Sequence, residues 1–386
     1  MKEIRLYNYQ AEMKERIDVA FRSYRSVMVQ MPTGTGKTVL LSEVVKSEER
    51  RVKNPWVWIV VHRRELVEQI RETLDTMLSA PYSTLDTTSP LLSDNSRIKV
   101  MSIQWLSRHY QDMAEKPSLI VIDEAHHAVA KTYAEVMNAY PEARKLGVTA
   151  TPCRLNKKGF TDLFDVLLQS WPTKKFIADG RLSLYDYMSI KADSIDQRMV
   201  FGLTKRGADG DFSLKEMSEK LDVQPSIERL CDTILRYAPH KKGIVYAIDI
   251  KHAEHIAEHY RVNGIHAVAI SSKTPNDERR LTIDKFKAGL IQVLVNVDLF
   301  GEGFDCPDVE FIQLARPTLS LAKYLQQVGR GMRVFEGKKF CLILDNVGLY
   351  RLFGLPSDER DWQSMFEGQI AGKGNITQAE ELYGVV

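Results

Sequence analysis

The sequence has few cysteines, no long apolar run and almost no net charge. Its four cysteines, among 386 residues, stand far apart and form no CxxC pair. A disulfide framework and a zinc module therefore have no support, and a reducing, cytoplasmic compartment is expected. No apolar stretch approaches the roughly 20 residues that span a bilayer, and the Met1–Gln10 segment is polar and charged, so neither a secretory signal nor a membrane partner is expected.

The charge balance limits how this chain could bind an anionic partner. Its 53 Lys and Arg residues nearly cancel its 51 Asp and Glu residues, which leaves a formal net charge of +2. A protein with this balance that grips phosphates must concentrate its basic residues locally. The length predicts about two or three domains, and the ordinary hydrophobic content predicts a soluble globular protein.

Short apolar, β-rich runs alternate with longer amphipathic stretches, which predicts parallel sheets with helices on both faces. In the first half, the expected strands are 27–31, 57–61, 98–101, 119–122 and 147–149, and the expected helices include 38–49 and 64–77. After Trp171-Pro172, the expected strands are 243–247, 266–270, 292–296, 311–315 and 340–344, and the expected helices are 250–263, 275–288 and 320–328. The polar segment 194–224 is expected to lie outside the core, and the residues after Asn346 have no clear periodicity.

A phosphate-binding loop is predicted at 32–38, which reads Pro-Thr-Gly-Thr-Gly-Lys-Thr between an apolar strand and a helix. The glycines allow the backbone to curl so that its N–H groups face the phosphates of ATP, and the positive end of the helix adds to the attraction. Lys37 would contact the phosphates, and the Thr38 hydroxyl would ligate Mg²⁺. Met31 stands where the strict pattern has its first glycine.

A second acidic motif supports this interpretation. The apolar run 119–122 leads into Asp123-Glu124-Ala125-His126, so that Asp123 should lie at the carboxyl edge of the sheet, beside the loop. Asp123 would hold Mg²⁺ through water, and Glu124 would orient and deprotonate the attacking water. By itself this motif would also fit a solvated strand end, but its pairing with the loop favours catalysis.

These two motifs and several others, in the same order, resemble those of the DEAD/DEAH-box helicases of superfamily 2. The 32–38 segment matches their motif I, and Asp123-Glu124-Ala125-His126 matches motif II. The further similar segments are Tyr9-Gln10 (the upstream Gln), 61–66 (Ia), 102–104 (Ib), 149–152 (III), 244–247 (IV), 295–307 (V) and 326–333 (VI). Within the superfamily, 315–318 and 324–331 are typical of the ResIII-like group, which contains RadD-type helicases, phage helicases and restriction-enzyme motors.

The resemblance implies an α/β fold of two tandem RecA-like domains, residues 1–172 and 173–345, followed by an unassigned extension, 346–386. The residues that it assigns to ATP binding are Gln10, Thr33, Gly34, Thr35, Gly36, Lys37, Thr38, Gly303 and Asp305. Those that it assigns to catalysis are Glu124, Gln326, Arg330 and Arg333, and those assigned to Mg²⁺ are Thr38 and Asp123. Coupling is assigned to His126, Thr149 and Thr151, and nucleic-acid binding to Arg63, Arg64, Ser102 and Gln104.

The spacing and charge of the residues support two of these assignments independently of the resemblance. Arg330 and Arg333 are spaced as neighbours on one helical face, so both could reach the negative charge that develops on the γ-phosphate, as arginine fingers do. Arg63 and Arg64 follow a strand and begin a helix, so they could hold a nucleic-acid phosphate, although a surface salt bridge fits them as well.

The expected function is ATP-driven translocation along nucleic acid, or its remodelling. DNA is favoured over RNA because DEAD-box RNA helicases have Ala-Asp where this chain has Ala125-His126. Two alternatives stay open besides an RNA helicase. One is a P-loop kinase or ATPase without nucleic acid, which the motifs at 295–307 and 326–333 oppose. The other is a binding module without turnover, which the intact charged residues oppose.

Overall fold

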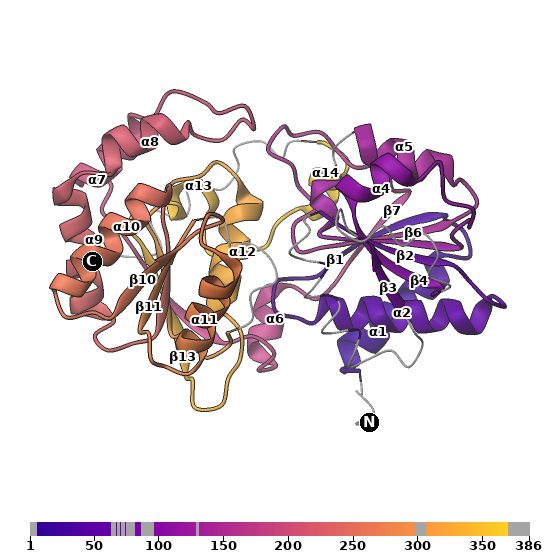
Figure 1. Cartoon of the computed structure of the whole chain (residues 1–386), viewed down its shortest axis with the longest axis horizontal. Coiled ribbons are helices and arrows are strands. Elements are labelled where there is room, and N and C mark those ends of the chain that lie inside the picture. The colour runs from indigo at the N-terminus through magenta and orange to yellow at the C-terminus, as the bar shows by residue number, and fades with distance from the viewer. Residues whose placement is uncertain are drawn as a thin grey trace. The chain divides into compact units, whose positions relative to one another are not determined.

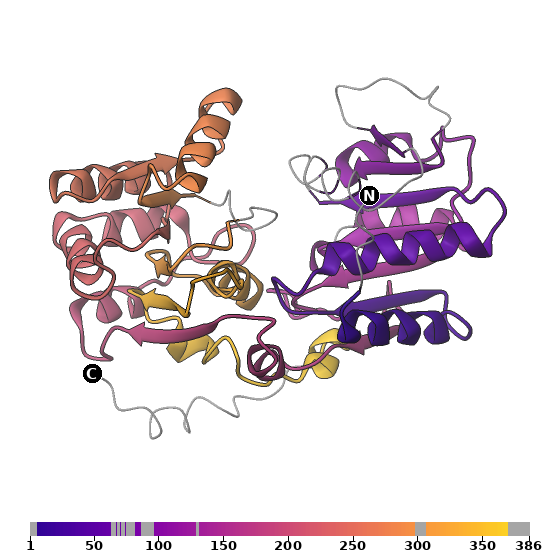
Figure 2. The same cartoon turned by 90° about the horizontal axis from the view of Figure 1, so that it is seen from below.

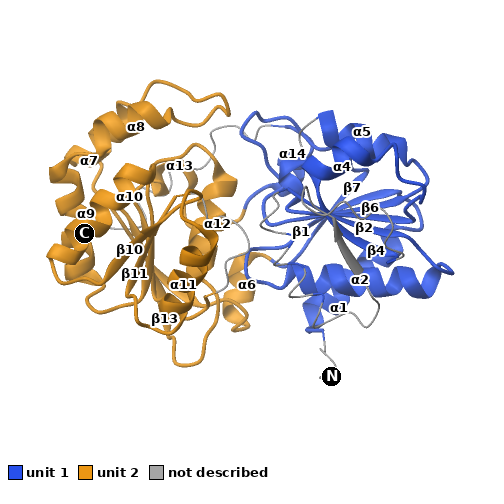
Figure 3. Cartoon of the chain, in the orientation of Figure 1, with its two compact units in different colours: residues 1–171, 360–371 blue, residues 172–359, 372–386 orange. Residues whose placement is uncertain are grey.

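The computed structural model describes residues 6–62, 67, 70, 74, 82–85, 96–128, 131–297 and 306–369. The chain divides into two compact units (Figure 3). Unit 1 contains the described residues up to Trp171 and also those from Arg360 to Gln369, whereas unit 2 contains those from Pro172 to Glu359. The first division falls one residue from the boundary expected from sequence. The described part of the expected extension, however, is shared between the units.

Unit 1 is built on a seven-stranded parallel sheet with the strand order β3-β4-β2-β5-β6-β1-β7. The strands are β1 (Ser26–Gln30), β2 (Val57–Val61), β3 (Tyr82–Leu85), β4 (Ile98–Ser102), β5 (Leu119–Asp123), β6 (Arg144–Thr149) and β7 (Val166–Gln169). Every residue of β1, β2 and β4 is buried, because helices cover both faces of the sheet. This double burial explains why β1 and β2 appear in the sequence as apolar runs, whereas β4 also contains the buried Lys99.

The helices of unit 1 lie on opposite faces of this sheet (Figure 1). On one face are α1 (Asn8–Ala20) and α2 (Lys37–Arg51), which Figure 2 shows from below. The other face carries α4 (Ile103–His109), α5 (Lys131–Ala139) and α14 (Trp362–Phe366), with the short 3-10 helix η1 (Ala125–His127) after β5. No helix in the described ranges is long and apolar enough to cross a membrane.

Unit 2 repeats this architecture with a six-stranded parallel sheet in the order β10-β11-β9-β12-β13-β8. The strands are β8 (Leu184–Ser189), β9 (Gly243–Tyr246), β10 (Ala267–Ile270), β11 (Val293–Asn296), β12 (Phe311–Leu314) and β13 (Phe340–Asp345). The expectation of an α/β chain with two helix-flanked parallel sheets is therefore confirmed.

The helices of unit 2 include two in the segment 194–224, which was expected to lie outside the core. They are α6 (Thr173–Ala178), α7 (Ile195–Phe201), α8 (Leu214–Leu221), α9 (Gln224–Tyr237), α10 (Ile250–Val262), α11 (Asn276–Lys287), α12 (Leu321–Gly331) and α13 (Tyr350–Phe353). The expectation that 194–224 lies outside the core is wrong, because the segment forms α7 and α8. Val200 and Met217 from these helices are buried in the same cluster as Tyr324 and Val328 of α12. Many of its polar residues are exposed, and others, such as Gln197, Asp211 and Glu216, are buried, so the composition of the segment hides its apolar stripe.

Three strands were not expected from the sequence: β3, β7 and β8. All three lie at edges of their sheets, where one side of the strand lacks a partner. In β8 the burial alternates between exposed and half-buried residues, and β7 is mostly half-buried. β3 and β8 interleave polar residues with apolar ones, and β7 has an apolar run of only three residues, so these short sequences did not mark them as strands. Most of the expected helix at 64–77 lies outside the described residues.

The described residues after Asn346 belong partly to unit 2 and partly to unit 1. The first of them form α13 in unit 2, and the chain then enters unit 1 as α14. Phe366 of α14 is buried and stacks on Phe160, with 6.3 Å between the ring centroids, and the Phe160 N–H donates to the Phe366 carbonyl at 2.7 Å. A Cβ on Gly159 would lie 2.6 Å from the backbone of Glu367, so this contact requires glycine.

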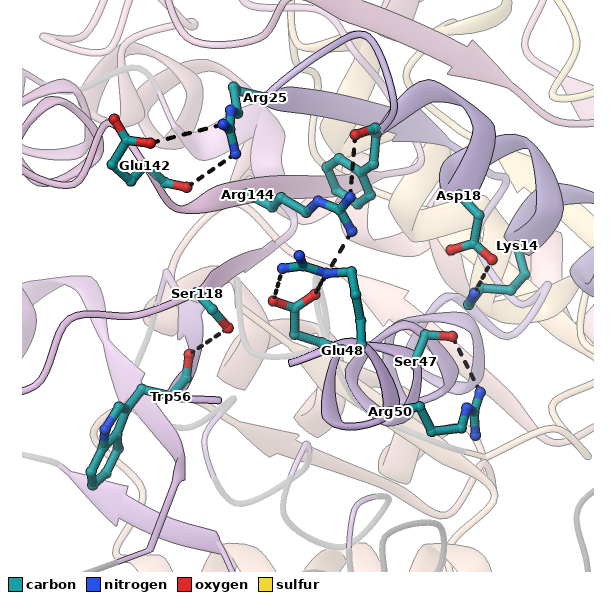
Figure 4. A network of polar contacts seen from close by, with 12 residues as sticks. Lys14, Asp18, Arg25, Ser47, Glu48, Arg50, Trp56, Ser118, Glu142 and Arg144 are labelled. Carbon is teal, nitrogen blue, oxygen red and sulfur yellow. Dashed lines mark hydrogen bonds and ion pairs between the residues drawn. The ribbon is translucent and has the colours of Figure 1, made fainter. Parts of the chain in front are cut away.

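A buried carboxylate joins the helices to the amino end of the unit 1 sheet (Figure 4). Glu48 of α2 is 3% exposed and forms ion pairs with Arg51 at 2.5 Å and with Arg144, the first residue of β6, at 3.8 Å. Arg144 also donates to the carbonyl of Phe21, directly after α1, at 3.3 Å. One carboxylate thus connects α1, α2 and β6, at the edge of the sheet opposite the phosphate-binding loop.

Replacing Glu48 with glutamine should therefore destabilise unit 1. The substitution keeps the volume but removes the charge that two guanidinium groups share, and a hydrogen bond to a charged group contributes about 1.5–3 kcal/mol. We expect a loss of about 2 kcal/mol in the free energy of unfolding, measured by urea denaturation with circular dichroism. The matched control is Glu142→Gln, because the Glu142–Arg25 pair is exposed and should contribute little. Equal effects of the two substitutions would contradict this role of Glu48.

Candidate ATP site

The loop between β1 and α2 has the conformation that a phosphate cradle requires. Gly34 and Gly36 have φ angles of 86° and 79°, which side chains other than glycine rarely adopt. Gly36 is the N-cap of α2, so the N–H groups and the positive dipole end of this helix are directed at the loop. Met31, which departs from the strict motif, is fully buried, and its N–H donates to the Thr149 carbonyl at 2.9 Å. Met31 therefore belongs to the sheet and not to the cradle.

The acidic motif lies at the same edge of the sheet as this loop, because β1, β6 and β5 are parallel neighbours. Lys37 Nζ is 3.7 Å from Glu124 Oε1, and both side chains are about a tenth exposed. Asp123 Oδ1 accepts a hydrogen bond from the Glu124 N–H at 3.0 Å. The structure thus brings together three residues that the sequence assigned to the phosphates, the metal and the attacking water.

The surroundings of Glu124 keep it ionised. Burial by itself raises its pKa, but the charge of Lys37 and the hydrogen bond from His126 together outweigh burial and hold the pKa well below its usual range. Glu124 also has a φ of 48°, in the left-handed region that non-glycine residues seldom occupy. Such a backbone is typical of functional sites, where the surrounding fold holds it in place. A carboxylate in this state can accept a hydrogen bond from water and orient it.

His126, Thr149 and Thr151, which were predicted to couple ATP hydrolysis to motion, contact one another through polar atoms. His126 Nδ1 is 3.0 Å from Thr149 Oγ1 and 3.3 Å from Glu124 Oε2. The Thr151 N–H donates to Thr149 Oγ1 at 3.1 Å, and both threonines are fully buried. The end of β6 is thereby connected to Glu124 through a single imidazole.

Gln10 contacts the backbone of the cradle. Its Nε2 donates to the carbonyls of Thr35 and Gly36 at 3.4 and 3.3 Å, and its Oε1 accepts from the Tyr7 N–H at 3.0 Å. The sequence did not assign a role to Tyr9, whose hydroxyl donates to the Thr35 carbonyl at 2.9 Å. The position of Tyr9 beside Gln10 was the only available indication, because the contact spans more than 20 residues of chain.

Arg154 is another residue whose role the sequence did not identify. Its guanidinium donates to the carbonyl of Ala128, directly after η1, at 2.9 Å and to that of Gly159 at 2.6 Å. It also lies over the Phe160 ring, 3.9 Å from the centroid. Arg154 therefore fixes the segment after Thr151 to the segment after the acidic motif.

The other predicted catalytic residues belong to unit 2. Gln326 and Arg330 lie on α12, whereas Arg333 lies two residues beyond the end of this helix at Gly331, so the expectation that both arginines share one helical face is wrong. Gln326 and Arg330 are 6% and 4% exposed. Burial raises the pKa of Tyr246, at the end of β9, whereas the charges of Arg330 and Arg333 act in the opposite direction. Both guanidinium groups are therefore within electrostatic reach of Tyr246, so unit 2 brings its motifs IV and VI together.

The residues predicted to bind nucleic acid differ in their burial, and some of them lie outside the described residues. Ser102 is buried, and its hydroxyl accepts from the Trp105 N–H at 3.3 Å, so its side chain caps α4. Gln104 is exposed. Arg63, Arg64, Gly303 and Asp305 lie outside the described residues.

Models of two protein families match the chain. The model described as type III restriction enzyme, res subunit (ResIII), matches residues 3–154, and the model described as helicase conserved C-terminal domain matches residues 225–335. The first match lies in the part of the chain that forms unit 1, and the second lies within unit 2.

Three curated relatives are similar over most of the chain. A 51.5 kDa protein of a Lactococcus phage is 33% identical over 356 residues, which are 92% of this chain and 73% of that protein. IRC3 of Saccharomyces cerevisiae, named as an ATP-dependent helicase, is 30% identical over 362 residues, 87% of this chain and 51% of IRC3. XPB2 of Sulfurisphaera tokodaii, named as a DNA 3'-5' translocase, is 24% identical over 365 residues, 86% of this chain and 79% of XPB2. The chain thus spans about half of the yeast relative.

A solved structure has the same fold. The structure of a fragment of an HsdR subunit of a type I restriction enzyme from Vibrio vulnificus aligns with a TM-score of 0.68 and 21% identity. The alignment covers 93% of this chain and 66% of that chain.

Proposed function

Because this chain belongs to the ResIII-like group of superfamily 2 helicases, with two tandem RecA-like domains, we propose that it is a motor that uses ATP to translocate along, unwind or remodel nucleic acid. The observation that carries this proposal is the geometry of Lys37, Glu124 and Asp123 beside a glycine cradle. These residues can bind phosphates and activate water, which is what ATP hydrolysis requires.

We assign the roles at this site as the motifs suggest. Residues 33–38 and Gln10 bind ATP, with Gly303 and Asp305, and Glu124 orients the attacking water and accepts its proton. A hydroxyl at Thr38 and a carboxylate at Asp123 are hard oxygen ligands, which suit Mg²⁺, and this ion would neutralise charge on the phosphates. His126, Thr149 and Thr151 couple the state of Glu124 to the end of β6.

From unit 2, we assign Gln326, Arg330 and Arg333 to the charge that develops on the γ-phosphate. Loss of that phosphate would release the guanidinium groups, which would tie the motion of the motor to hydrolysis. This assignment rests on the similarity of 326–333 to the helicase motif and on the burial of Gln326 and Arg330.

We propose DNA as the nucleic acid. A relative similar along 86% of this chain is named as a DNA translocase, and Ala125-His126 departs from the Ala-Asp of DEAD-box RNA helicases. Gln104 is exposed at the start of α4 and, with Arg63 and Arg64, is the proposed contact to the strand.

The test is ATP hydrolysis by the full chain with single-stranded DNA, duplex DNA, branched DNA, RNA or no nucleic acid. We expect DNA to raise the turnover number several-fold more than RNA does, because DNA binding should favour the catalytic arrangement. Strand displacement on the best activator would then separate unwinding from translocation alone. Hydrolysis that no nucleic acid changes would favour an ATPase of another class, and stimulation by RNA alone would favour an RNA helicase.

A further inference from the structure

Three histidine rings pack in series beside Glu124, the first two stacked and the third tilted, and this series is called the stack below. His62, directly after β2, stacks on His127 with 4.0 Å between the ring centroids and 11° between the planes. The centroid of His127 is in turn 4.1 Å from that of His126, with the planes tilted by 40°. His126 is the residue whose Nδ1 lies 3.3 Å from Glu124 Oε2 and 3.0 Å from Thr149 Oγ1. The stack therefore joins the end of β2 to the carboxylate that activates water.

The other end of this stack is connected to an exposed residue. Gln104 stands in the first turn of α4, and its Nε2 donates to the carbonyl of His62 at 2.7 Å. Since β2 and β4 are neighbouring parallel strands, His62 and Gln104 follow strand ends at the same edge of the sheet. A ligand that pulls on the Gln104 amide would alter the position of His62 through this hydrogen bond.

We propose that His62 and His127 are positioning residues that transmit nucleic-acid binding at Gln104 to Glu124. This inference rests on the proposed function, and it adds two residues that the helicase motifs do not assign to catalysis. Flat rings packed at 4 Å cannot move independently, because close packing leaves no free volume between them. A shift of His62 therefore moves His127 and then His126, whose hydrogen bonds set the direction of the Glu124 carboxylate.

Only a small movement of the Glu124 carboxylate is required to change the rate. Proton abstraction from the attacking water needs a heavy-atom distance of about 2.6–3.2 Å, so a displacement of a fraction of an ångström decides whether Glu124 is aligned. A misplacement of about 1 Å can lower a rate about 100-fold. Thr149, held by the Thr151 N–H, provides the fixed point against which the His126 ring pivots.

The test asks whether a flat ring at positions 62 and 127 is sufficient, or whether the imidazole group itself is needed. The variants are His62→Ala, His62→Leu, His62→Phe and His127→Phe in the full chain, and the measured quantities are kcat and KM for ATP with and without saturating single-stranded DNA. We expect His62→Ala and His62→Leu to reduce the DNA stimulation of kcat at least fivefold, with little change in KM. The two phenylalanine variants should keep most of the stimulation, because they preserve a flat ring. A double variant His62→Ala/His127→Ala should lose no more than His62→Ala alone, since one break interrupts the stack.

The matched control is His109→Ala. His109 stacks on Trp105 at 4.3 Å in the same unit but has no place in this stack, so its loss should leave the stimulation unchanged. If His62→Ala fails to fold by circular dichroism, the Leu and Phe variants decide alone, since they have similar volumes and differ in the flat ring.

The outcomes distinguish the inference from the function on which it rests. No stimulation of the native chain by any nucleic acid would overturn the proposed function. Stimulation of the native chain with equal stimulation of His62→Ala and His62→Leu would overturn only the role of the stack. Equal losses in His62→Leu and His62→Phe would also overturn it, because ring packing would then not be what matters.

Discussion

Replacing Glu124 with glutamine should leave ATP binding intact and slow hydrolysis about 10²- to 10⁴-fold, the contribution of a general base. The amide keeps the shape of the side chain but cannot accept the proton of the attacking water. The charge of Lys37 and the hydrogen bond from His126 hold the pKa of Glu124 below its usual range, so the native residue is ionised and can orient the attacking water. The variant should therefore accumulate with ATP bound, and in the proposed motor it should stay on DNA.

Two comparisons make this test specific. Lys37→Ala should lose ATP affinity as well as turnover, because Lys37 is the cation of the cradle and lies 3.7 Å from Glu124. Glu43→Gln is the matched control, since Glu43 belongs to α2 but pairs with Lys46 and Arg50, away from the cradle. ATP affinity would be measured by fluorescence titration and turnover by phosphate release. Turnover at the native rate by Glu124→Gln would assign water activation to another residue.

Replacing Arg330 with alanine should reduce hydrolysis on the order of 10³-fold and leave ATP binding nearly unchanged, because arginine fingers contribute this much to turnover. The proposed ATP-binding residues 33–38 belong to unit 1, whereas Arg330 lies on α12 of unit 2. A large effect on kcat with a small effect on affinity would therefore show that unit 2 takes part in the chemical step.

Arg330 is 4% exposed, so the variant needs a check for folding. Arg330→Gln keeps more of the volume and should show the same loss of turnover, and circular dichroism would compare the thermal unfolding of both variants with that of the native chain. The exposed Arg236, whose guanidinium lies over the Tyr237 ring, provides the control Arg236→Ala. Native turnover by both Arg330 variants would remove Arg330 from the site.

The Arg330 variants should be tested in the full chain, because a fragment of unit 1 alone would be incomplete. A fragment that ends at residue 172 would lack α14, and Phe366 of α14 is buried with Phe160 and Trp105 in the core of unit 1. Weak activity of such a fragment could then result from a damaged core and not from the loss of Arg330. Point substitutions in the full chain keep unit 1 complete.

Several features of the fold and the site could be read from the sequence because they are local. Buried parallel strands are rich in apolar residues, so the central strands of both sheets were found within about one residue of their observed bounds, except β6, which begins three residues before its expected start. The cradle and the acidic motif each lie within a few consecutive residues at the end of a strand. Parallel pairing places strand ends at one edge, so the proximity of Lys37 to Glu124 followed from topology and not from any detail of packing.

Other features depend on residues that are distant in sequence, and only the tertiary structure decided them. The edge strands β7 and β8 form because neighbouring strands offer free backbone groups, and their own short sequences do not mark them as strands. The Ser102 hydroxyl was expected at nucleic acid, but the adjoining α4 uses it as a helix cap.

The sequence by itself determined the fold class and the assignment of the chain to ATP-hydrolysing helicases, since apolar periodicity and the phosphate-binding motifs are patterns of consecutive residues. The tertiary structure alone decided which distant residues touch Glu124 and which segments complete each unit. His62 and His127 are 65 positions apart in the chain, so no local pattern could reveal that their rings stack at 4.0 Å. The return of α14 to unit 1 is of the same kind, because the burial of Phe366 depends on a surface that another part of the chain builds.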